Sequence, residues 1–311
     1  MRTSITNPLL RGILYCIVGT FSFALSNIAF QMALKDLPHV VGQFYSNILC
    51  ILTVIPAYRQ KPIKNSSAFV ALVCALTVWQ MSATFALTFI TSTEHTCIVG
   101  VSVFIIPLLS HRFFGIRFRS KLIIFAGSLS LVGLIFLVQP SFLFGGNKTG
   151  AIELIGYACA FAAMFSKSIF VCFQRVSDEN EVSTIIVSSA LSSLLFARAL
   201  NDGFASFNLK NSAFLIASSL LSNFGTYALM KGCADINPTI SGIVLQFQAV
   251  FAFIISNVLG MERSVTFGKI SGLVLIMISA IFYIAQTRND DSKIVLLSPE
   301  IEKIFYSDEE L

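Results

Sequence analysis

Charged side chains are scarce in this sequence. Asp, Glu, Lys and Arg make up only 12% of its 311 residues, about half the share typical of soluble domains. Histidine occurs three times and tryptophan once. Such a chain lacks the charge that solvates a soluble enzyme, keeps a disordered chain extended, or contacts a nucleic-acid backbone. With a mean hydropathy of +0.81, it is predicted to lie in a membrane instead.

The few charges are also segregated. Stretches of more than 20 residues carry none, among them 12–34, 65–93, 122–147 and 236–261. A helix of about 20 apolar residues crosses the roughly 30 Å hydrocarbon core of a bilayer. The sequence therefore predicts an all-α integral membrane protein that crosses the bilayer several times.

Ten apolar segments are long enough to be transmembrane helices. They run near 12–34, 39–58, 67–90, 94–111, 120–139, 150–174, 182–201, 211–231, 236–259 and 265–287. The residues between them are charged or turn-forming, as loops require. The whole chain is predicted to form one membrane domain.

Catalytic and metal-binding patterns are missing. The seven cysteines lie singly in apolar segments without a CxxC pair, which indicates reduced packing residues. The three histidines, His39, His95 and His111, all lie near predicted span ends. Membrane hydrolases and metalloenzymes need clustered His, Asp, Glu or an activated Ser. We therefore expect no enzyme, no cofactor and no metal site.

Carboxylates are absent from the middle of the predicted spans. Glu94 and His95 are expected to form a solvated pair at the outer mouth, between the third and fourth spans. Carriers that relay protons hold Asp, Glu or His within the membrane. The sequence thus favours exchange or facilitated movement over proton-driven pumping.

The basic residues predict the orientation. With both termini in the cytoplasm, fourteen of the 21 Lys and Arg fall on the cytoplasmic side and six on the outer side. Cytoplasmic loops carry an excess of Lys and Arg. We expect a multi-pass protein of the cell inner membrane, with cytoplasmic N- and C-termini.

The two halves of the chain resemble each other. At an offset of 145 residues, Gly115 aligns with Gly260 and Gly127 with Gly272, each before or within an apolar segment. Because each half has five spans, an odd number, the second must be inverted relative to the first. Inverted repeats are typical of secondary transporters. The halves are predicted to cover 10–139 and 150–287, followed by a polar cytoplasmic tail over 288–311.

Ten spans, a five-plus-five repeat and one turn motif together resemble a known family. The turn is Leu259-Gly260-Met261-Glu262-Arg263, followed by Gly268 and Gly272. These features are similar to the EamA family of the drug/metabolite transporter (DMT) superfamily over residues 10–287. The first-half counterpart, 114–118, has Arg117 where the family has Glu. The resemblance implies small-molecule transport.

Within that family, Ser26, Asn27 and the turn at Pro107 resemble bacterial S-adenosylmethionine carriers. The resemblance implies uptake or exchange of S-adenosylmethionine. Export of amino acids or related metabolites is the alternative. A sensor that does not transport is a remote third possibility, because the tail is too short for a folded output domain.

Lys167 is the one ionisable residue placed well inside a span. A lysine at mid-membrane normally faces a cavity or a partner. Its ammonium could therefore bind a substrate carboxylate or phosphate. Alternatively, it could snorkel to the cytoplasmic face near Arg175.

Several uncharged polar residues are spaced to share a helix face with a partner. Either they line a polar pathway, or they form hydrogen bonds between helices. Trp79 lies mid-span, where it could stack on an aromatic substrate or belong to the core. The candidate substrate-binding residues are Lys167, Asn27, Gln31, Trp79, Gln80, Asn223, Tyr227 and Gln246. The expected partners are a small metabolite and the lipid bilayer, without nucleic acid, for a monomer or homodimer.

Overall fold

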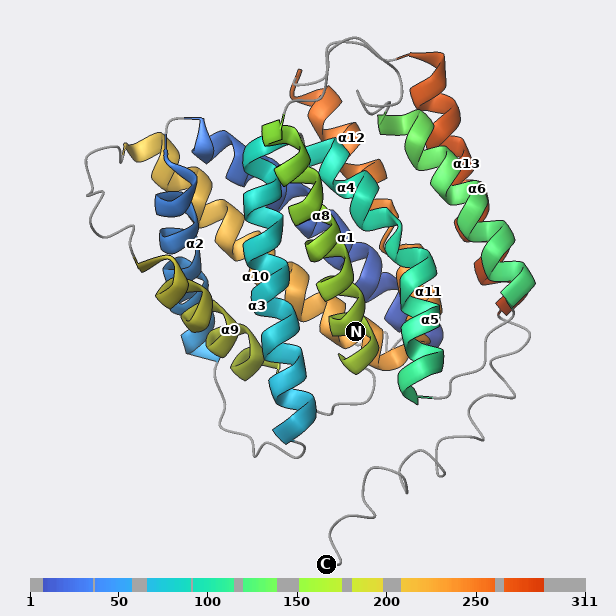
Figure 1. Ribbon diagram of the computed structural model, residues 1–311, viewed down its shortest axis with the longest axis horizontal. Coiled ribbons are helices and arrows are strands. Elements are labelled where there is room, and N and C mark those ends of the chain that lie inside the picture. The colour runs from blue at the N-terminus through green and yellow to red at the C-terminus, as the bar shows by residue number, and fades with distance from the viewer. Residues whose placement is uncertain are drawn as a thin grey trace, which may run out of the picture.

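The computed structural model describes residues 8–35, 37–57, 66–90, 92–114, 120–138, 151–174, 181–197, 208–260 and 266–287. Within these ranges the chain is helical and contains no strand (Figure 1). Most of the turn motif and its first-half counterpart, at 261–265 and 115–119, lie outside the described residues, as does the tail.

The helices follow the apolar segments closely. The first half contains α1 (Pro8–Leu34), α2 (His39–Val54) with the short helix η1 (Ile55–Ala57), α3 (Ser66–Phe89), α4 (Ser92–Gly100), α5 (Ser102–Phe114) and α6 (Ser120–Val138). The second half contains α8 (Ala151–Gln174), α9 (Glu181–Leu195), α10 (Leu209–Asp235), α11 (Pro238–Val244), α12 (Phe247–Val258) and α13 (Phe267–Thr287).

Six helical segments are long and apolar enough to cross a membrane: Pro8–Leu34, Ser66–Phe89, Glu94–Phe113, Leu154–Gln174, Leu209–Asp235 and Ile240–Val258. Four shorter apolar helices accompany them: His39–Val54, Ile124–Leu137, Glu181–Leu195 and Phe267–Phe282. Large apolar side chains such as Phe125 and Ile281 are exposed on the outside of the bundle, as they are where lipid covers a surface. The predicted all-helical class is confirmed, and the helices are compatible with a membrane protein.

Two predicted spans are broken in the middle. The chain turns at Val101 between α4 and α5, and at Leu245 and Gln246 between α11 and α12. Within these turns the amides of Val101 and Gln246 bond three residues back, to Ile98 and Ile243, at 3.0 and 3.1 Å. Such bonds keep the backbone groups satisfied inside the protein, as a low-dielectric environment requires.

The two breaks lie against each other. The side-chain amide nitrogen of Gln246 donates a hydrogen bond to the Gly100 carbonyl at 3.3 Å, and its side-chain oxygen accepts one from the Ser130 hydroxyl in α6. The side chain of one break therefore holds the backbone of the other.

Small residues bring the longest helices together. A Cβ added at Gly19 would lie 3.1 Å from the Gly225 carbonyl oxygen, and one at Gly225 would lie 3.2 Å from the Gly19 oxygen. About two helical turns further along, Ser26 and Ser218 bond reciprocally, with each hydroxyl donating to the other's carbonyl at 2.9 and 3.1 Å. Since one residue number rises as the other falls, α1 and α10 run antiparallel. Close backbone approach of this kind is typical of membrane helices.

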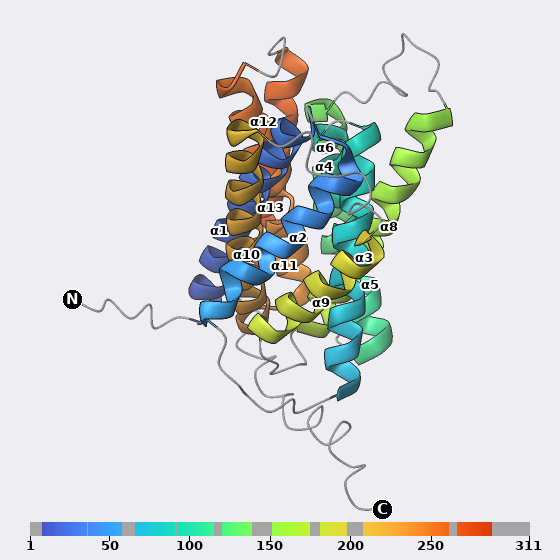
Figure 2. The same ribbon diagram turned by 90° about the vertical axis from the view of Figure 1, so that its left-hand side faces the viewer.

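The pair α6 and α13 forms one edge of the bundle, with α2 and α9 at the opposite edge (Figures 1 and 2). Gly133 and Gly272 lie at the α6–α13 crossing, and a Cβ at Gly133 would lie 2.7 Å from the Gly272 oxygen. The Ser279 hydroxyl donates to the Ala126 carbonyl at 2.6 Å further along the pair. The middle of the bundle, between these two edges, holds the site described next.

Candidate functional site

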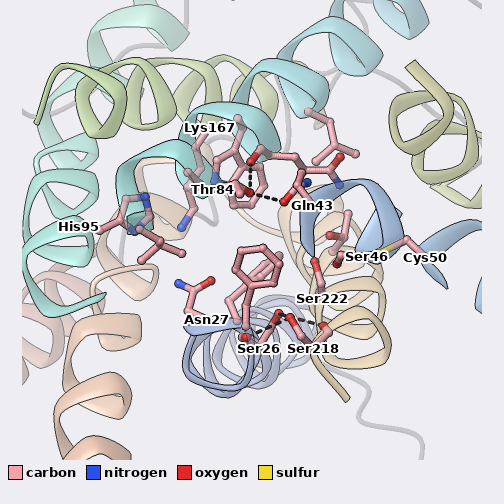
Figure 3. Close-up of a pocket in the computed structure, with 18 of the residues that line it drawn as sticks. Ser26, Asn27, Gln43, Ser46, Cys50, Thr84, His95, Lys167, Ser218 and Ser222 are labelled. Atoms are coloured by element: carbon pink, nitrogen blue, oxygen red, sulfur yellow. Dashed lines mark hydrogen bonds between the residues drawn. The ribbon is translucent and has the colours of Figure 1, made fainter. Parts of the chain in front are cut away.

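A polar cavity lies in the middle of the bundle (Figure 3). Its wall is built by α1, α2, α3, α4, α8, α10 and α12, which come from both halves of the chain. The non-atom space in and around it measures about 720 Å³, of which about 80 Å³ admits the centre of a water-sized sphere. The polar residues of the lining are Ser26, Asn27, Gln43, Ser46, Asn47, Gln80, Thr84, His95, Lys167, Ser218, Ser222, Thr226 and Gln248.

Lys167 carries the only formal charge of the described lining, since no Asp or Glu lies there. The side chain is 1% exposed. Its ammonium donates to the Gln248 amide oxygen at 2.8 Å and lies 5.1 Å from the Trp79 ring centroid. The Phe23 ring lies 5.9 Å away. Lys167 therefore ends inside the bundle, where neutral groups and aromatic faces surround it, and does not snorkel to the surface.

An opposite wall of the cavity is neutral and hydrogen-bonded. The Gln43 amide donates to the Asn47 oxygen at 3.0 Å, and the Thr84 hydroxyl donates to the Gln43 oxygen. Ser46 and Ser219 lie 3.1 Å apart, hydroxyl to hydroxyl. These bonds join α2 to α3 and α10, so they fix the wall while leaving polar atoms facing the space.

Several buried polar atoms at the cavity have no hydrogen-bond partner among the described residues. They are both ring nitrogens of His95, the Gln80 amide oxygen and the Asn47 amide nitrogen. A buried polar atom without a partner is costly, and such atoms mark a place where water or a ligand binds. The cavity thus presents unused donors and an unused acceptor.

The structure corrects the prediction for His95. This residue was expected in a solvated loop, but α4 begins at Ser92 and places His95 in its first turn, 2% exposed. Figure 3 places its ring at the same end of the cavity as the Lys167 amine and the Asn27 amide. The prediction was wrong because the turn between α3 and α4 is too short to hold His95 outside the bundle. Glu94 accepts a hydrogen bond from Tyr157 at 3.2 Å.

Four of the eight candidate residues line the cavity: Asn27, Trp79, Gln80 and Lys167. Trp79 is 7% exposed and packs between Phe23 and Phe170, with ring centroids 5.3 and 5.8 Å away. It therefore belongs to the aromatic core and to the cavity wall at once.

The other four candidates lie elsewhere. Gln31 lines a second hollow, near the turn from α1 to α2. Asn223 donates to the Cys50 carbonyl at 2.8 Å and to the Thr53 hydroxyl at 2.7 Å, joining α10 to α2. Tyr227 is 39% exposed on the outside of the bundle. Gln246 holds the helix breaks together, as described above, and it is Gln248 that lines the cavity.

Sequence reasoning missed much of the neutral wall. Gln43 and Asn47 are four residues apart, as are Ser218 and Ser222. That is the spacing that pointed to Asn27 and Gln80, so the signal was present in α2 and α10. Serine is common in membrane helices and forms many helix–helix contacts, so the serine pair alone would not have marked the cavity.

The two ends of the cavity differ. At one end the second hollow adjoins it, since Leu87 lines both; the hollow is also lined by Leu34, Lys35 and His39. This end lies at the last turn of α1 and the first of α2.

At the other end, the first turns of α1 and the last turns of α10 are tied together. Arg11 pairs with both carboxylate oxygens of Asp235, at 2.7 and 2.8 Å. Cys16, Ile236 and Ile240 pack in the apolar cluster beneath this pair. None of these residues lines the cavity, whose described lining stops short of this end.

No three His, Cys, Asp or Glu side chains of the described residues gather into a metal site. The site therefore offers binding groups of other kinds: one ammonium, an imidazole, amides, hydroxyls and aromatic faces. These groups suit a small polar molecule with an aromatic or apolar part.

Comparison with known proteins gives a fold likeness alone. No protein-family model matches the chain, and no curated protein matches its sequence. In contrast, 29 chains of solved structures match its fold. One, described as "Crystal structure of protein", is 16% identical with a TM-score of 0.70, and the match covers 87% of this chain and 98% of that one. The chain is thus similar in fold, along almost its whole described length, to a solved protein.

Proposed function

We propose that this protein is a secondary transporter of the EamA type within the DMT superfamily. In this proposal it crosses the inner membrane ten times, in two inverted halves of five spans, and moves a small metabolite by alternating access. The six long apolar segments and the four shorter apolar helices together account for ten spans.

The packing of the helices supports the inverted repeat. If the two halves correspond helix by helix, α1 is equivalent to α8 and α3 is equivalent to α10. The contact of α1 with α10 then becomes the contact of α8 with α3, and both pairs are among the most extensive in the bundle. In the same way the contact of α2 with α10 becomes that of α9 with α3, and α6–α13 becomes itself. Two halves related by a twofold axis would pack in this reciprocal way.

The single observation that carries the proposal is the cavity itself. A polar space lined by both halves, and containing a buried lysine, occupies the middle of an apolar bundle. Substrate sites of inverted-repeat transporters lie at the repeat interface near mid-membrane. One end of the site adjoins a hollow, and at the other end Arg11 pairs with Asp235 beyond the cavity lining. This difference between the ends supports access from one side at a time, as alternating access requires.

The charge distribution supplies the orientation. With cytoplasmic termini, as the excess of Lys and Arg favours, the turn from α1 to α2 faces outward. The end that adjoins the hollow then faces the outside, and the end at Arg11 and Asp235 faces the cytoplasm.

The proposed transport substrate is S-adenosylmethionine, taken up or exchanged. The aromatic side chain of Trp79 in the cavity wall supports a purine-containing solute. The alternative is export of amino acids, which the ammonium, imidazole and amide groups of the lining also suit.

Counterflow in proteoliposomes tests the function. Vesicles containing the purified chain are loaded with unlabelled S-adenosylmethionine, and entry of labelled S-adenosylmethionine is followed, with and without a protonophore. We expect saturable entry that S-adenosylhomocysteine blocks and the protonophore leaves unchanged. Protein-free vesicles control for leakage of the labelled compound. The Lys269→Gln variant should transport like the unaltered chain, because Lys269 packs over Phe253, away from the cavity.

The outcomes separate the two substrates. Counterflow of amino acids but not of S-adenosylmethionine would move the assignment to the alternative. Counterflow of neither, with the chain shown to be folded in the vesicles, would refute a carrier function for both. Entry that collapses with the protonophore alone would refute exchange.

A further inference from the structure

We propose that the cavity is a binding site for an α-amino acid group, in which Lys167 and His95 hold the carboxylate and Gln80 accepts a hydrogen bond from the amino group. This inference deepens the proposed function and rests on the same cavity. It names the part of the substrate that the protein recognises.

The first step concerns charge. The Lys167 ammonium is buried without a carboxylate in the described lining of its cavity. An ammonium has three N–H donors, and Gln248 accepts one of them. A neutral amide and two aromatic faces compensate the desolvation of a buried charge only partly. An anion in the cavity would complete the compensation, whereas a solute with only positive charge would be repelled.

The second step concerns His95. Its ring is buried and lines the cavity, and neither ring nitrogen has a hydrogen-bond partner in the part of the chain that the structure describes. A neutral imidazole offers one N–H donor. Figure 3 places this ring and the Lys167 amine at the same end of the cavity. Two donors at one end suit the two oxygens of a carboxylate, each of which accepts hydrogen bonds.

The third step distinguishes an amino acid from a simple anion. The Gln80 amide oxygen lines the same cavity, is buried, and lacks a donor. Inorganic phosphate would satisfy Lys167 and His95, but it could donate to this acceptor only through a P–OH group that it still carries near neutral pH. An α-amino acid carries a carboxylate acceptor and an ammonium donor on the same carbon. Its ammonium can therefore donate to Gln80 while its carboxylate binds the two donors.

This arrangement also removes a difficulty with S-adenosylmethionine. Its sulfonium would be repelled by Lys167 if the two were in contact. With the carboxylate bound at Lys167, the sulfonium lies further along the chain of the substrate. The aromatic faces of Phe23 and Phe30 and the neutral wall at Gln43 are among the other surfaces of the cavity.

The chain contains its own reporter for the test. Trp79 is its only tryptophan, and its ring centroid lies 5.1 Å from the Lys167 nitrogen. The fluorescence of the full chain in lipid nanodiscs therefore reports on this cavity. The probes are L-methionine against L-methioninamide, S-adenosylhomocysteine against methylthioadenosine, and inorganic phosphate. In each pair the second compound lacks the carboxylate.

We expect L-methionine and S-adenosylhomocysteine to change the fluorescence saturably, and their partners to bind at least tenfold more weakly. Lys167→Gln and His95→Gln should each weaken binding of L-methionine at least tenfold. Gln80→Leu should weaken L-methionine at least fivefold but leave 4-(methylthio)butanoate, which lacks the amino group, within twofold. Matched controls are Lys269→Gln and His111→Gln, because both residues lie outside the cavity lining.

Three results would overturn the inference. They are equal binding of acid and amide by the unaltered chain, stronger binding of phosphate than of L-methionine, and no fluorescence change with either amino acid. The comparison of acid with amide needs no variant, so misfolding of a variant cannot decide it. Amino-acid binding without counterflow would refute the carrier and leave the site. Counterflow without carboxylate preference would refute the site and leave the carrier.

Discussion

Replacing Gly272 by alanine should loosen the edge of the bundle formed by α6 and α13. A Cβ built at Gly272 would lie 2.5 Å from the Leu137 amide nitrogen and 3.0 Å from its Cα, whereas ordinary contacts measure 3.4–4 Å. These are backbone atoms, so no side-chain rotation can relieve the overlap. The two helices must separate by roughly 1 Å, and a gap of that size forfeits a quarter to a half of each dispersion contact.

Overpacking of a well-packed interface costs about 1–3 kcal/mol. At about 2–4 °C for each kcal/mol in a large domain, the unfolding midpoint should fall by roughly 2–12 °C. Gly133→Ala should have a smaller effect, because its Cβ would lie 2.7 Å from one carbonyl oxygen but no closer than 3.0 Å to its other neighbours. The measurement is the loss of the monodisperse size-exclusion peak after heating in detergent.

The control is Val274→Leu on the same helix, where the side chain is 45% exposed and can grow outward. That variant should melt within about 1 °C of the unaltered chain, since surface changes shift stability by about 0.5 kcal/mol or less. A Gly272→Ala variant as stable as the unaltered chain would refute the close crossing of α6 and α13. Because this edge lies away from the cavity, L-methionine binding should be unchanged in variants that remain folded.

Three further predictions concern the end at Arg11 and Asp235 and the bonds inside the bundle. Arg11→Ala should speed maleimide labelling of buried Cys16 in inside-out vesicles. Exchanging the charges, with Arg11→Asp and Asp235→Arg together, should restore slow labelling. An unchanged labelling rate in Arg11→Ala would show that this ion pair does not close the end. Gln246→Leu leaves the Gly100 carbonyl and the Ser130 hydroxyl without their partner, so it should lower the stability measured in thermal unfolding by about 1–3 kcal/mol. The preference for L-methionine over L-methioninamide should stay the same. A changed preference would place Gln246 in the site. Asn223→Leu removes two hydrogen bonds to α2. It should lower the free energy of unfolding by about 1 kcal/mol, at about 0.6 kcal/mol for each bond in a membrane interior, and counterflow should not be lost.

The sequence predicts where the helices lie better than it predicts where they break and which side chains face the cavity. Segment ends are marked by charges and turn residues, so the bounds of α1, α3 and α8 lie close to the predicted ones. The breaks at Val101 and Gln246 have no such mark. They are stabilised by a contact between segments 146 residues apart, from Gln246 to Gly100. A local pattern cannot contain a contact over that distance.

The residues of the site also differ in how well the sequence predicts them. Lys167 could be predicted to face a cavity, because a charge in apolar surroundings needs a partner wherever the helix points. Asn223 and Gln246 could not be assigned, because an amide is equally suited to a substrate and to a neighbouring helix. Only packing decides between them, and both amides bond to protein. His95 was expected in solvent at the start of the fourth span, but α4 begins two residues earlier, at Ser92, and His95 lines the cavity.

The contact between the two helix breaks has a mechanical consequence. Each break is a point where its span can bend, so α4 can tilt against α5 and α11 against α12. The Gln246 side chain joins these two hinges through the Gly100 carbonyl, and Ser130 fixes that side chain from α6. A bend at one hinge is therefore transmitted to the other rather than absorbed locally. Since α4 carries His95 and α12 carries Gln248, the two sides of the cavity change shape together.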